Sequence, residues 1–411
     1  MNLTSPNKYA LVYLCTILLV VTVAAAGQAG HLDPTFGNGG IATQQKIVTQ
    51  TTNFYAVGGA AIQSDGKIVV VGGTPGGNDF NVPAIFRFLS NGSLDKSFGS
   101  NGIAVLPGSF GSYGAVAIQS DGKILAGTSA AGPNAEVDRF TTTGHLDSSF
   151  GTKGRVSFRL SSFLGLALQP DGRILAAVQS FGNSRSEVTR LLANGSTDTS
   201  FGTNGSTFAP GGAGPLQVLA NGDILVFGGL ISRLTTSGGV DTEFGVNGQL
   251  LAQGGGHAIA ADGDILVAGS LVNDPTVPSS AFAVFSYQGV GIGDPAFGKN
   301  GGVSTLLPGF PGVGAAGLGL ESTGDIVELA SAANGNSGAF GLVRYTPQGQ
   351  LDTTFGSGGT VATTFGNNAT VTASAIAIQS DDKIVAVGTL VTGLLHGQFN
   401  TALVVTRYLG K

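Results

Sequence analysis

Carboxylates are the side chains of this sequence with the most capacity for chemistry, because they can bind hard cations or transfer protons. The 411 residues include 24 Asp and Glu. Seven Asp open a repeated motif, Asp-x-x-Phe-Gly-x-x-Gly, and nine more acids lie in tight polar turns, which leaves eight elsewhere. The motif places at regular intervals Asp33, Phe36, Gly37, Asp95, Phe98, Gly99, Asp147, Phe150, Asp198, Phe201, Asp241, Phe244, Asp294, Phe297, Asp352 and Phe355.

The seven repeated Asp are predicted to hold turns rather than to bind metal. A turn Asp accepts hydrogen bonds from nearby backbone N–H groups and tolerates left-handed geometry. A ring of seven carboxylates binding Ca²⁺ is the functional alternative. Calcium needs several oxygens within one loop, and the Asp-x-Asp-x-Asp-Gly spacing is absent. An Arg stands eight residues before most of these Asp, as Arg87 does before Asp95, and we expect it to brace the turn.

Four histidines can hardly supply the several ligands that a propeller lactonase, quinoprotein or zinc enzyme places in its channel, whereas a Ser-His-Asp triad stays open as an alternative. His31 and His145 occupy the same repeat position, so both are predicted to be surface turn residues. His257 follows three Gly, and His396 lies in a loop. The sequence lacks Gly-x-Ser-x-Gly, and its Gly-rich stretches lack the Lys and helix pattern of a phosphate site. We therefore predict no catalytic residue, no metal and no cofactor.

The composition favours an all-β protein. With 69 Gly, 15 Pro and only 10% charged residues, the chain is poorly suited to helices, while 42% apolar residues provide for a core. A mean hydropathy of +0.29 argues against disorder. The net charge of −5, with 19 Lys and Arg, disfavours nucleic acid as a partner.

Each repeat, about 53 residues long, is predicted to form four short strands. Between motif copies lies an apolar run, a polar turn and a second apolar run, as in Ala-Ile-Gln-Ser-Asp-Gly-Lys-Ile around Asp65. Asp-Gly between alternating apolar residues indicates a β-hairpin, here expected to be closed by a two-residue type I′ turn. The strand that holds the Arg and the strand after Phe-Gly-x-x-Gly complete the four.

Seven such units predict a seven-bladed β-propeller, a single domain over residues 30–411, with four antiparallel strands per blade. The chain ends with Arg407-Tyr-Leu-Gly-Lys, and the Gly-x-Leu-Asp that should follow stands at Gly30 to Asp33. The N- and C-terminal segments should therefore pair to close the ring, with the strand near Ile41 to Val48 as the outer strand of the last blade. A β-solenoid is the alternative. The repeat Phe residues are expected to fill the wedges between blades.

Residues 1–29 have the layout of a secretory signal peptide. Residues 9–26 are almost wholly apolar and follow Lys8, and small residues suit cleavage near Ala26 or Ala29. An uncleaved membrane anchor is the alternative. The only cysteine, Cys15, lies in this segment, so no disulfide is expected. The protein is predicted to be secreted, extracellular or periplasmic, and monomeric.

Variable loops indicate where binding takes place. Strand direction alternates, so both kinds of repeated turn lie on one face of the propeller, here called the turn face. The irregular loops lie on the opposite face, the loop face. Candidate binding residues in these loops are Asp79, Phe80, Asp274 and His396. We predict a non-catalytic module that binds an unknown protein or glycan at the cell exterior. A propeller hydrolase or lyase acting on polysaccharide or another extracellular polymer is the alternative.

The repeated residues resemble the delta-60 repeat family of bacterial secreted and surface proteins. The shared features are the Leu-Asp-x-Ser/Thr-Phe-Gly turn, the Ala-Ile-Gln-x-Asp-Gly-Lys-Ile hairpin and the Arg-Tyr strand. The resemblance implies a propeller-like repeat domain at the cell exterior and brings no activity, ligand or catalytic residues. The chain departs from the pattern at Asn221, Asp223, Ser286, Thr323 and Asp325.

Overall fold

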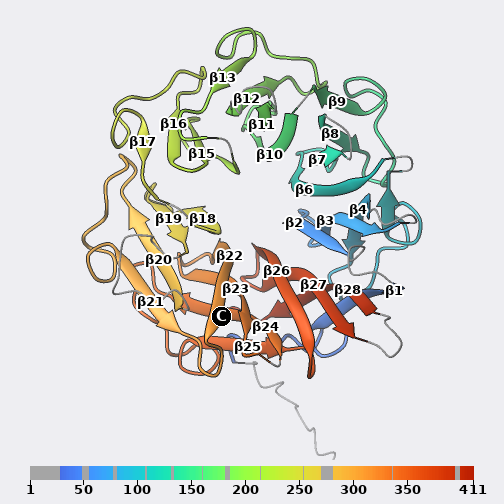
Figure 1. Ribbon diagram of the computed structural model, residues 1–411, viewed down its shortest axis with the longest axis vertical. Coiled ribbons are helices and arrows are strands. Elements are labelled where there is room, and N and C mark those ends of the chain that lie inside the picture. The colour runs from blue at the N-terminus through green and yellow to red at the C-terminus, as the bar shows by residue number, and fades with distance from the viewer. Residues whose placement is uncertain are drawn as a thin grey trace, which may run out of the picture.

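The computed structural model is a ring of seven four-stranded antiparallel sheets (Figure 1). It describes residues 28–48, 55–76, 81–106, 109–130, 134–159, 161–180, 186–212, 214–252, 254–269, 281–335, 337–393 and 399–411. These residues contain no helix and therefore no helix that could cross a membrane. The predicted seven-bladed β-propeller is confirmed, and the solenoid alternative is wrong.

Each blade consists of four strands, innermost first. Blade 1 contains β2 Ala56–Ile62, β3 Ile68–Pro75, β4 Asn81–Phe88 and β5 Ile103–Val105. Blade 2 contains β6 Gly111–Ile118, β7 Ile124–Ala130, β8 Ala135–Phe140 and β9 Arg155–Phe158. Blade 3 contains β10 Ser161–Leu168, β11 Ile174–Ser180, β12 Ser186–Leu191 and β13 Ser206–Phe208. Blade 4 contains β14 Leu216–Val218, β15 Ile224–Phe227, β16 Ile231–Leu234 and β17 Gln249–Leu250.

The remaining blades complete the ring. Blade 5 contains β18 Gly256–Ile259, β19 Ile265–Ala268, β20 Ala281–Tyr287 and β21 Gly302–Leu306. Blade 6 contains β22 Gly312–Leu320, β23 Ile326–Ala333, β24 Gly338–Tyr345 and β25 Thr360–Thr364. Blade 7 contains β26 Ala369–Ile378, β27 Ile384–Gly393, β28 Phe399–Tyr408 and, from the start of the chain, β1 Ile41–Val48.

Pairing of the two chain ends closes the ring. Strand β1 runs antiparallel to β28, with Ile41 opposite Thr406 and Val48 opposite Phe399. Beyond the strands, Asp33 N donates to Arg407 O at 2.8 Å, and Gly30 N donates to Leu409 O at 2.7 Å. The three-plus-one closure predicted from the split repeat is therefore confirmed.

The hydrophobic core is divided among the wedges between neighbouring blades. Phe98 lies with Val69 and Ile85 of blade 1 and Tyr113 and Phe140 of blade 2 in one cluster. Every repeat Phe is buried in such a cluster and is at most 2% exposed. Burying a large aromatic side chain contributes about 2–3 kcal/mol, so these wedges supply much of the cohesion between blades.

The hairpin turns differ from the predicted two-residue type I′ geometry. Gly66 N donates to Gln63 O, and Gln63 N donates to Lys67 O, each at 2.9 Å. Gly66 has a φ of 79°, but Asp65 is not among the residues with positive φ. Ser64, Asp65 and Gly66 thus form a three-residue loop, a type I turn followed by a left-handed residue. The prediction failed because an Asp-Gly pair suits both loop lengths.

Six arginines, one in every blade except blade 5, form staples that link their blade to the next. The Nε atom of each lies 2.7–3.0 Å from the repeat Asp of the same turn, including Arg407 with Asp33 across the chain ends. Each guanidinium also lies over a repeat Phe ring, 4.3–4.8 Å from the ring centroid. The Nη1 atom then donates to a carbonyl of the following blade, as from Arg87 to Thr142 O at 2.6 Å. Each of these arginines therefore pairs with the Asp of its own turn, lies over a repeat Phe ring and hydrogen-bonds to the neighbouring sheet.

Replacing Arg407 by Met is expected to lower the free energy of unfolding by about 3–5 kcal/mol, because it removes the buried guanidinium that pairs with the buried Asp33 carboxylate. Arg407 and Asp33 are 4% and 2% exposed. Urea denaturation of the two proteins measures the difference. Lys67→Met is the matched control, because Lys67 forms a more exposed ion pair with Asp65 in the equivalent hairpin of blade 1 and should cost no more than about 1 kcal/mol. Equal losses in the two variants would show that Arg407 does not hold the seam.

Candidate functional site

The innermost strands, which surround the central axis in Figure 1, carry almost no ionisable side chains. In β2, β6, β10, β14, β18, β22 and β26 the only ones are Tyr113 and His257. The described residues also contain no group of three or more His, Cys, Asp or Glu arranged to hold a metal ion. These strands are built mainly from Gly, Ala, Ser, Val and Ile, which bring no acid–base chemistry to the axis.

The His257 side chain packs in the wedge between blades 4 and 5. Its ring stacks on Phe227 of the preceding blade, with centroids 3.8 Å apart and an interplanar angle of 18°. Burial lowers the pKa of His257 to about 4, so the imidazole is neutral at physiological pH. His31 and His145 are exposed at turns, and His396 lies outside the described residues.

A polar cluster that sequence reasoning missed lies in the wedge between blades 1 and 2. The Asp138 carboxylate accepts hydrogen bonds from Tyr113 Oη at 2.8 Å and from Arg155 Nε at 2.7 Å. Glu136 is paired with Arg155 Nη1 at 3.3 Å, and burial raises its pKa. Two carboxylates beside a Tyr and an Arg can perform acid–base chemistry, but Tyr113 and Asp138 have no exposed surface. The cluster therefore stabilises the wedge, because no substrate reaches these two groups.

A second buried acid, Glu328, lies in the wedge between blades 5 and 6. It shares a face of β23 with Ile326 and Ala330, which belong to the core of that wedge, and it is 1% exposed. Burial raises the pKa of Glu328 well above its usual range, which favours the neutral acid. Its enclosure excludes contact with a ligand.

The sequence-predicted loop residues Asp79, Phe80, Asp274 and His396 all lie outside the described residues. Of the strands beside them, β3 continues to Pro75 and β27 continues to Gly393. The prediction for these four residues stays a prediction.

The loop face contains a cavity of about 360 Å³ between blades 6 and 7. Its wall combines the end of β23, the following loop and the start of β26, and the lining residues are Ser331, Ala332, Ala333, Gly335, Ser337, Gly338, Asn368, Ala369, Thr370 and Val371. None of these side chains is charged. Ala332, Gly338, Ala369 and Val371 are buried, whereas Asn368 and Thr370 are exposed and offer hydrogen-bonding groups.

Two backbone features shape this cavity. Gly338 lies so close to blade 7 that a Cβ atom there would be 2.6 Å from Val371 N, so only glycine permits the approach. Asn368, at the rim, has a left-handed φ of 58°, a conformation that costs free energy for a residue with a side chain. The cavity is thus defined by the junction of two blades.

Blade 5 departs from the staple pattern on the turn face. Ser286 stands where blade 1 has Arg87, and Asp264 stands where the hairpin of blade 1 has Lys67. Asp294 still accepts a hydrogen bond from Ala296 N at 3.0 Å, but no cation pairs with it among the described residues. Burial, together with Asp262 and Asp294, raises the pKa of Asp264. Blades 5 and 6 are therefore joined without the guanidinium that links the others.

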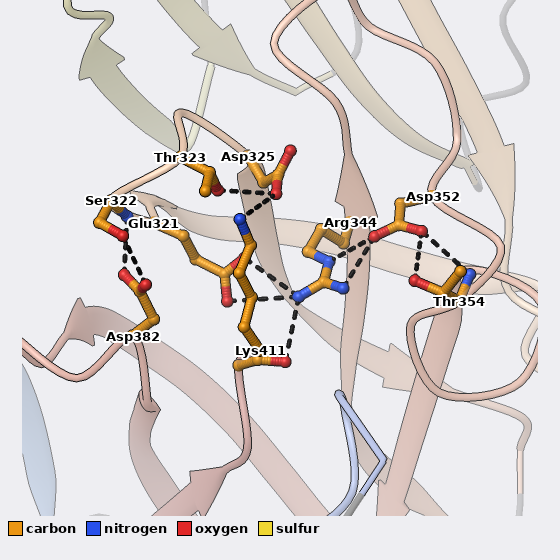
Figure 2. Close-up of polar contacts among 10 residues, drawn as sticks. Glu321, Ser322, Thr323, Asp325, Arg344, Asp352, Thr354, Asp382 and Lys411 are labelled. Atoms are coloured by element: carbon orange, nitrogen blue, oxygen red, sulfur yellow. Dashed lines mark hydrogen bonds and ion pairs between the residues drawn. The ribbon is translucent and has the colours of Figure 1, made fainter.

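Figure 2 shows an acidic cluster where blade 6 meets the end of the chain. Arg344 Nη1 contacts Glu321 Oε2 at 3.0 Å and donates to Gly410 O at 3.2 Å, while its Nε donates to Asp352 at 2.8 Å. Lys411 Nζ lies 3.4 Å from Asp325, which stands where the hairpins of blades 1, 2 and 7 have Lys. Burial raises the pKa of Glu321 to about 7, despite Arg344.

Asp382, which has a left-handed backbone conformation, belongs to the same junction. It takes the position of the hairpin Gly with a φ of 61°, and its carboxylate accepts bonds from Ser322 N at 2.7 Å and Ser322 Oγ at 2.6 Å (Figure 2). The bonds cross from blade 7 to blade 6. All of these groups are satisfied within the protein, so the cluster is a structural joint.

Sequence comparison matches four segments of the chain to a family described as a domain of unknown function, DUF5122, a β-propeller. The matched residues are 63–98, 119–150, 169–201 and 329–355. The matched repeats are similar to those of a β-propeller family. No curated protein matches the sequence.

Solved structures with a similar arrangement of this β-propeller include enzymes, at low identity. A virginiamycin B lyase from Staphylococcus aureus is 11% identical, with a TM-score of 0.49, over 88% of this chain and 99% of the lyase. The polysaccharide lyase Uly1 is 12% identical, with a TM-score of 0.41, over 94% of each chain. An aldose sugar dehydrogenase from Streptomyces coelicolor is 13% identical, with a TM-score of 0.37, over 89% of this chain and 98% of that one. Similarity at this level carries no argument about activity.

Introducing the missing staple should stabilise the β-propeller. Ser286→Arg places a guanidinium beside the Asp294 carboxylate and the Phe297 ring, and we expect the free energy of unfolding to rise by about 1–3 kcal/mol. Urea denaturation measures it. Ser286→Leu is the control, because it adds bulk without charge. A gain no larger than that of the Leu variant would contradict the assignment of blade 5 as an unstapled junction.

Glu321 should make the stability of the β-propeller depend on pH. Its folded pKa of about 7 exceeds that of an unfolded Glu, so the folded state binds the additional proton and stability falls as pH rises from about 4.5 to about 7. Glu321→Gln introduces the residue that the hairpin of blade 7 has at this position, Gln379. There Gln379 Oε1 accepts a hydrogen bond from Arg407. We expect this variant to flatten the pH profile of urea unfolding.

The exposed Glu243→Gln is the control and should leave that profile unchanged. If Glu321→Gln and the wild type show the same slope between pH 5 and 7, another group is responsible.

Proposed function

We propose that this propeller is an exported, monomeric and non-catalytic binding module that captures a protein or glycan at the cell exterior through its loop face. Export rests on residues 1–29, which have the layout of a cleaved signal peptide. The observation that carries the binding role is the uncharged cavity between blades 6 and 7 on that face.

The two faces differ in how far their polar groups are already bonded within the protein. On the turn face, the repeat Asp, Arg and backbone groups are engaged with one another, as in the pairing of Arg190 with Asp198 and with Thr236 O. On the loop face, Asn368 and Thr370 expose hydrogen-bonding groups around a floor of small apolar side chains. This difference supports recognition on the loop face.

The lining of the cavity favours a neutral ligand. A charged group placed there would lose water and gain no counter-charge from the lining residues, which costs several kcal/mol. Hydroxyl and amide side chains can both donate and accept, so they suit a ligand that does the same. A sugar residue or a peptide backbone segment fulfils this requirement.

An array of neutral and acidic glycans, with a peptide library beside it, tests the proposal on the mature protein. We expect neutral members to bind, and Thr370→Arg to weaken binding at least about tenfold, because Arg fills the cavity mouth and adds an uncompensated charge. Thr152→Arg is the matched control, since Thr152 is exposed at a turn on the opposite face. Equal loss in both variants, or no loss in either, would overturn the loop-face assignment.

The same array separates binding from catalysis. Release of new reducing ends or of unsaturated products from a bound polysaccharide would identify a hydrolase or a lyase instead. The inner strands argue against this outcome, because Tyr113 and His257 are their only ionisable residues and both are turned into blade wedges.

A further inference from the structure

Three exposed apolar side chains lie in two turns that touch each other on the turn face, where blades 4 and 5 meet. Val246 is 75% exposed, Val290 is 52% exposed and Ile292 is 54% exposed. Gly245 N donates to Val290 O at 2.8 Å across the two blades, and Gln288 N donates to Ile292 O at 2.8 Å within the turn of blade 5. We call Val246, Val290 and Ile292 the apolar patch.

The repeat fold does not require apolar residues at these three positions. The position of Val246 is polar in all six other turns, for example Ser100 in blade 1. The position of Val290 is polar in blades 1, 2, 3, 4 and 6, for example Asn91. Where Ile292 stands, the other turns have Ser, His, Gln or Gly. Scattered exposed apolar residues are common, but a group of them at one place indicates a site of interaction.

Three carboxylates lie beside the apolar patch. Asp262 and Asp264 belong to the hairpin of blade 5, and Asp294 opens the repeat motif of the same blade. The Asp264 carboxylate is hydrogen-bonded by the backbone of Gly289, which directly precedes Val290. Among the residues that the structure describes, none of the three carboxylates forms an ion pair. The turn face is therefore anionic at blade 5, whereas the arginine staples neutralise the repeat Asp of the other blades.

No cation within the described part of the protein compensates these charges. Burial, together with the charges of Asp262 and Asp294, raises the pKa of Asp264, as expected where like charges gather. Lys299 is exposed in the same blade but pairs with none of the three. A cation brought by a partner would relieve this repulsion, so the charge around the patch is complementary to a basic ligand.

We infer that the apolar patch and the three carboxylates bind a segment of a partner protein in which Lys or Arg stands next to apolar residues. The apolar side chains of the segment would cover the patch, and its cations would pair with the Asp carboxylates. A second copy of this chain fits less well, because a two-fold contact through the patch would bring carboxylates of the two copies together. The site lies on the face opposite the cavity between blades 6 and 7, so it goes beyond the proposed function and does not depend on it.

Selection of a phage-displayed library of random dodecapeptides on the protein tests the site. We expect enriched peptides with Lys or Arg beside apolar residues, and an affinity at least about tenfold lower for the double variant Val246→Ser, Val290→Asn. Both substitutions introduce the residues of blade 1 at exposed positions, so the fold should be kept. Val105→Ser is the matched control, because Val105 is 43% exposed outside the patch. If the double variant weakens no enriched peptide, or weakens only peptides without Lys or Arg, the inference is wrong.

Asp264→Asn tests the electrostatic contribution separately. It removes one negative charge beside the patch and should weaken the same peptides about threefold, with a smaller effect at high salt. Thr152→Lys changes the net charge by the same amount at an exposed turn of blade 2 and should leave the affinity unchanged. Equal losses in these two variants would show that only net charge matters, and would overturn the site.

The oligomeric state and the loop face give two independent checks. Analytical ultracentrifugation should show a monomer. A dimer that the double variant Val246→Ser, Val290→Asn dissociates would assign the patch to a second copy and overturn the inference. Thr370→Arg should leave the affinity of the basic peptides unchanged, because Thr370 lies at the cavity on the opposite face. A peptide that Thr370→Arg alone weakens belongs to the loop face and counts against the patch, so the two proposals can fail separately.

Discussion

The ring depends on the arginine guanidinium that each stapled blade extends to its neighbour. A guanidinium is planar and presents several donors at fixed angles, so a single side chain can hold the carboxylate of its own turn, lie over the repeat Phe and still reach the next blade. Arg139 does all three, with Asp147, Phe150 and Ala193 O. Lysine could supply the charge but not this combination. Apolar contact in the wedges supplies cohesion, and the staple sets the relative position of the sheets.

The staple also sets the acid–base behaviour of the turn face. The hydrogen bond from Ser149 Oγ, reinforced by Arg139, lowers the pKa of Asp147 to about 2, and Ser200 with Arg190 lowers that of Asp198 to about 2. These carboxylates stabilise the fold above the pKa of an unfolded Asp, and the contribution is lost as pH falls toward 2. Glu321 acts in the opposite sense. The turn face should therefore be most stable in mildly acidic solution.

Repetition made the architecture predictable, and the exceptions to it were not. Because Asp-x-x-Phe-Gly recurs with fixed neighbours, blade number, strand order and the split closing blade followed from the sequence. The Tyr113–Asp138–Arg155 cluster did not, since its members come from three different strands and stand at repeat positions where the other blades have other residues. Only the folded sheet brings them together. The cavity between blades 6 and 7 was equally hidden, because its lining residues are small, neutral and outside any motif. The loop residues that the sequence predicted instead have charged or aromatic side chains, which are easier to recognise as candidates for binding than small neutral ones.

Unequal strand lengths explain why the loop face is the one that varies. The second strand of every blade begins at an Ile directly after the hairpin, as β15 does at Ile224 and β27 at Ile384, so the strands are aligned at the turn face. Any difference in length must then project at the opposite face. Strand β27 has ten residues and β15 has four, which makes blade 7 taller than blade 4 on the loop side. The cavity lies between the long strands of blades 6 and 7, where sheet walls rather than loops alone give it depth. A scaffold that holds one face constant by its staples can therefore change the other by strand length without disturbing the ring.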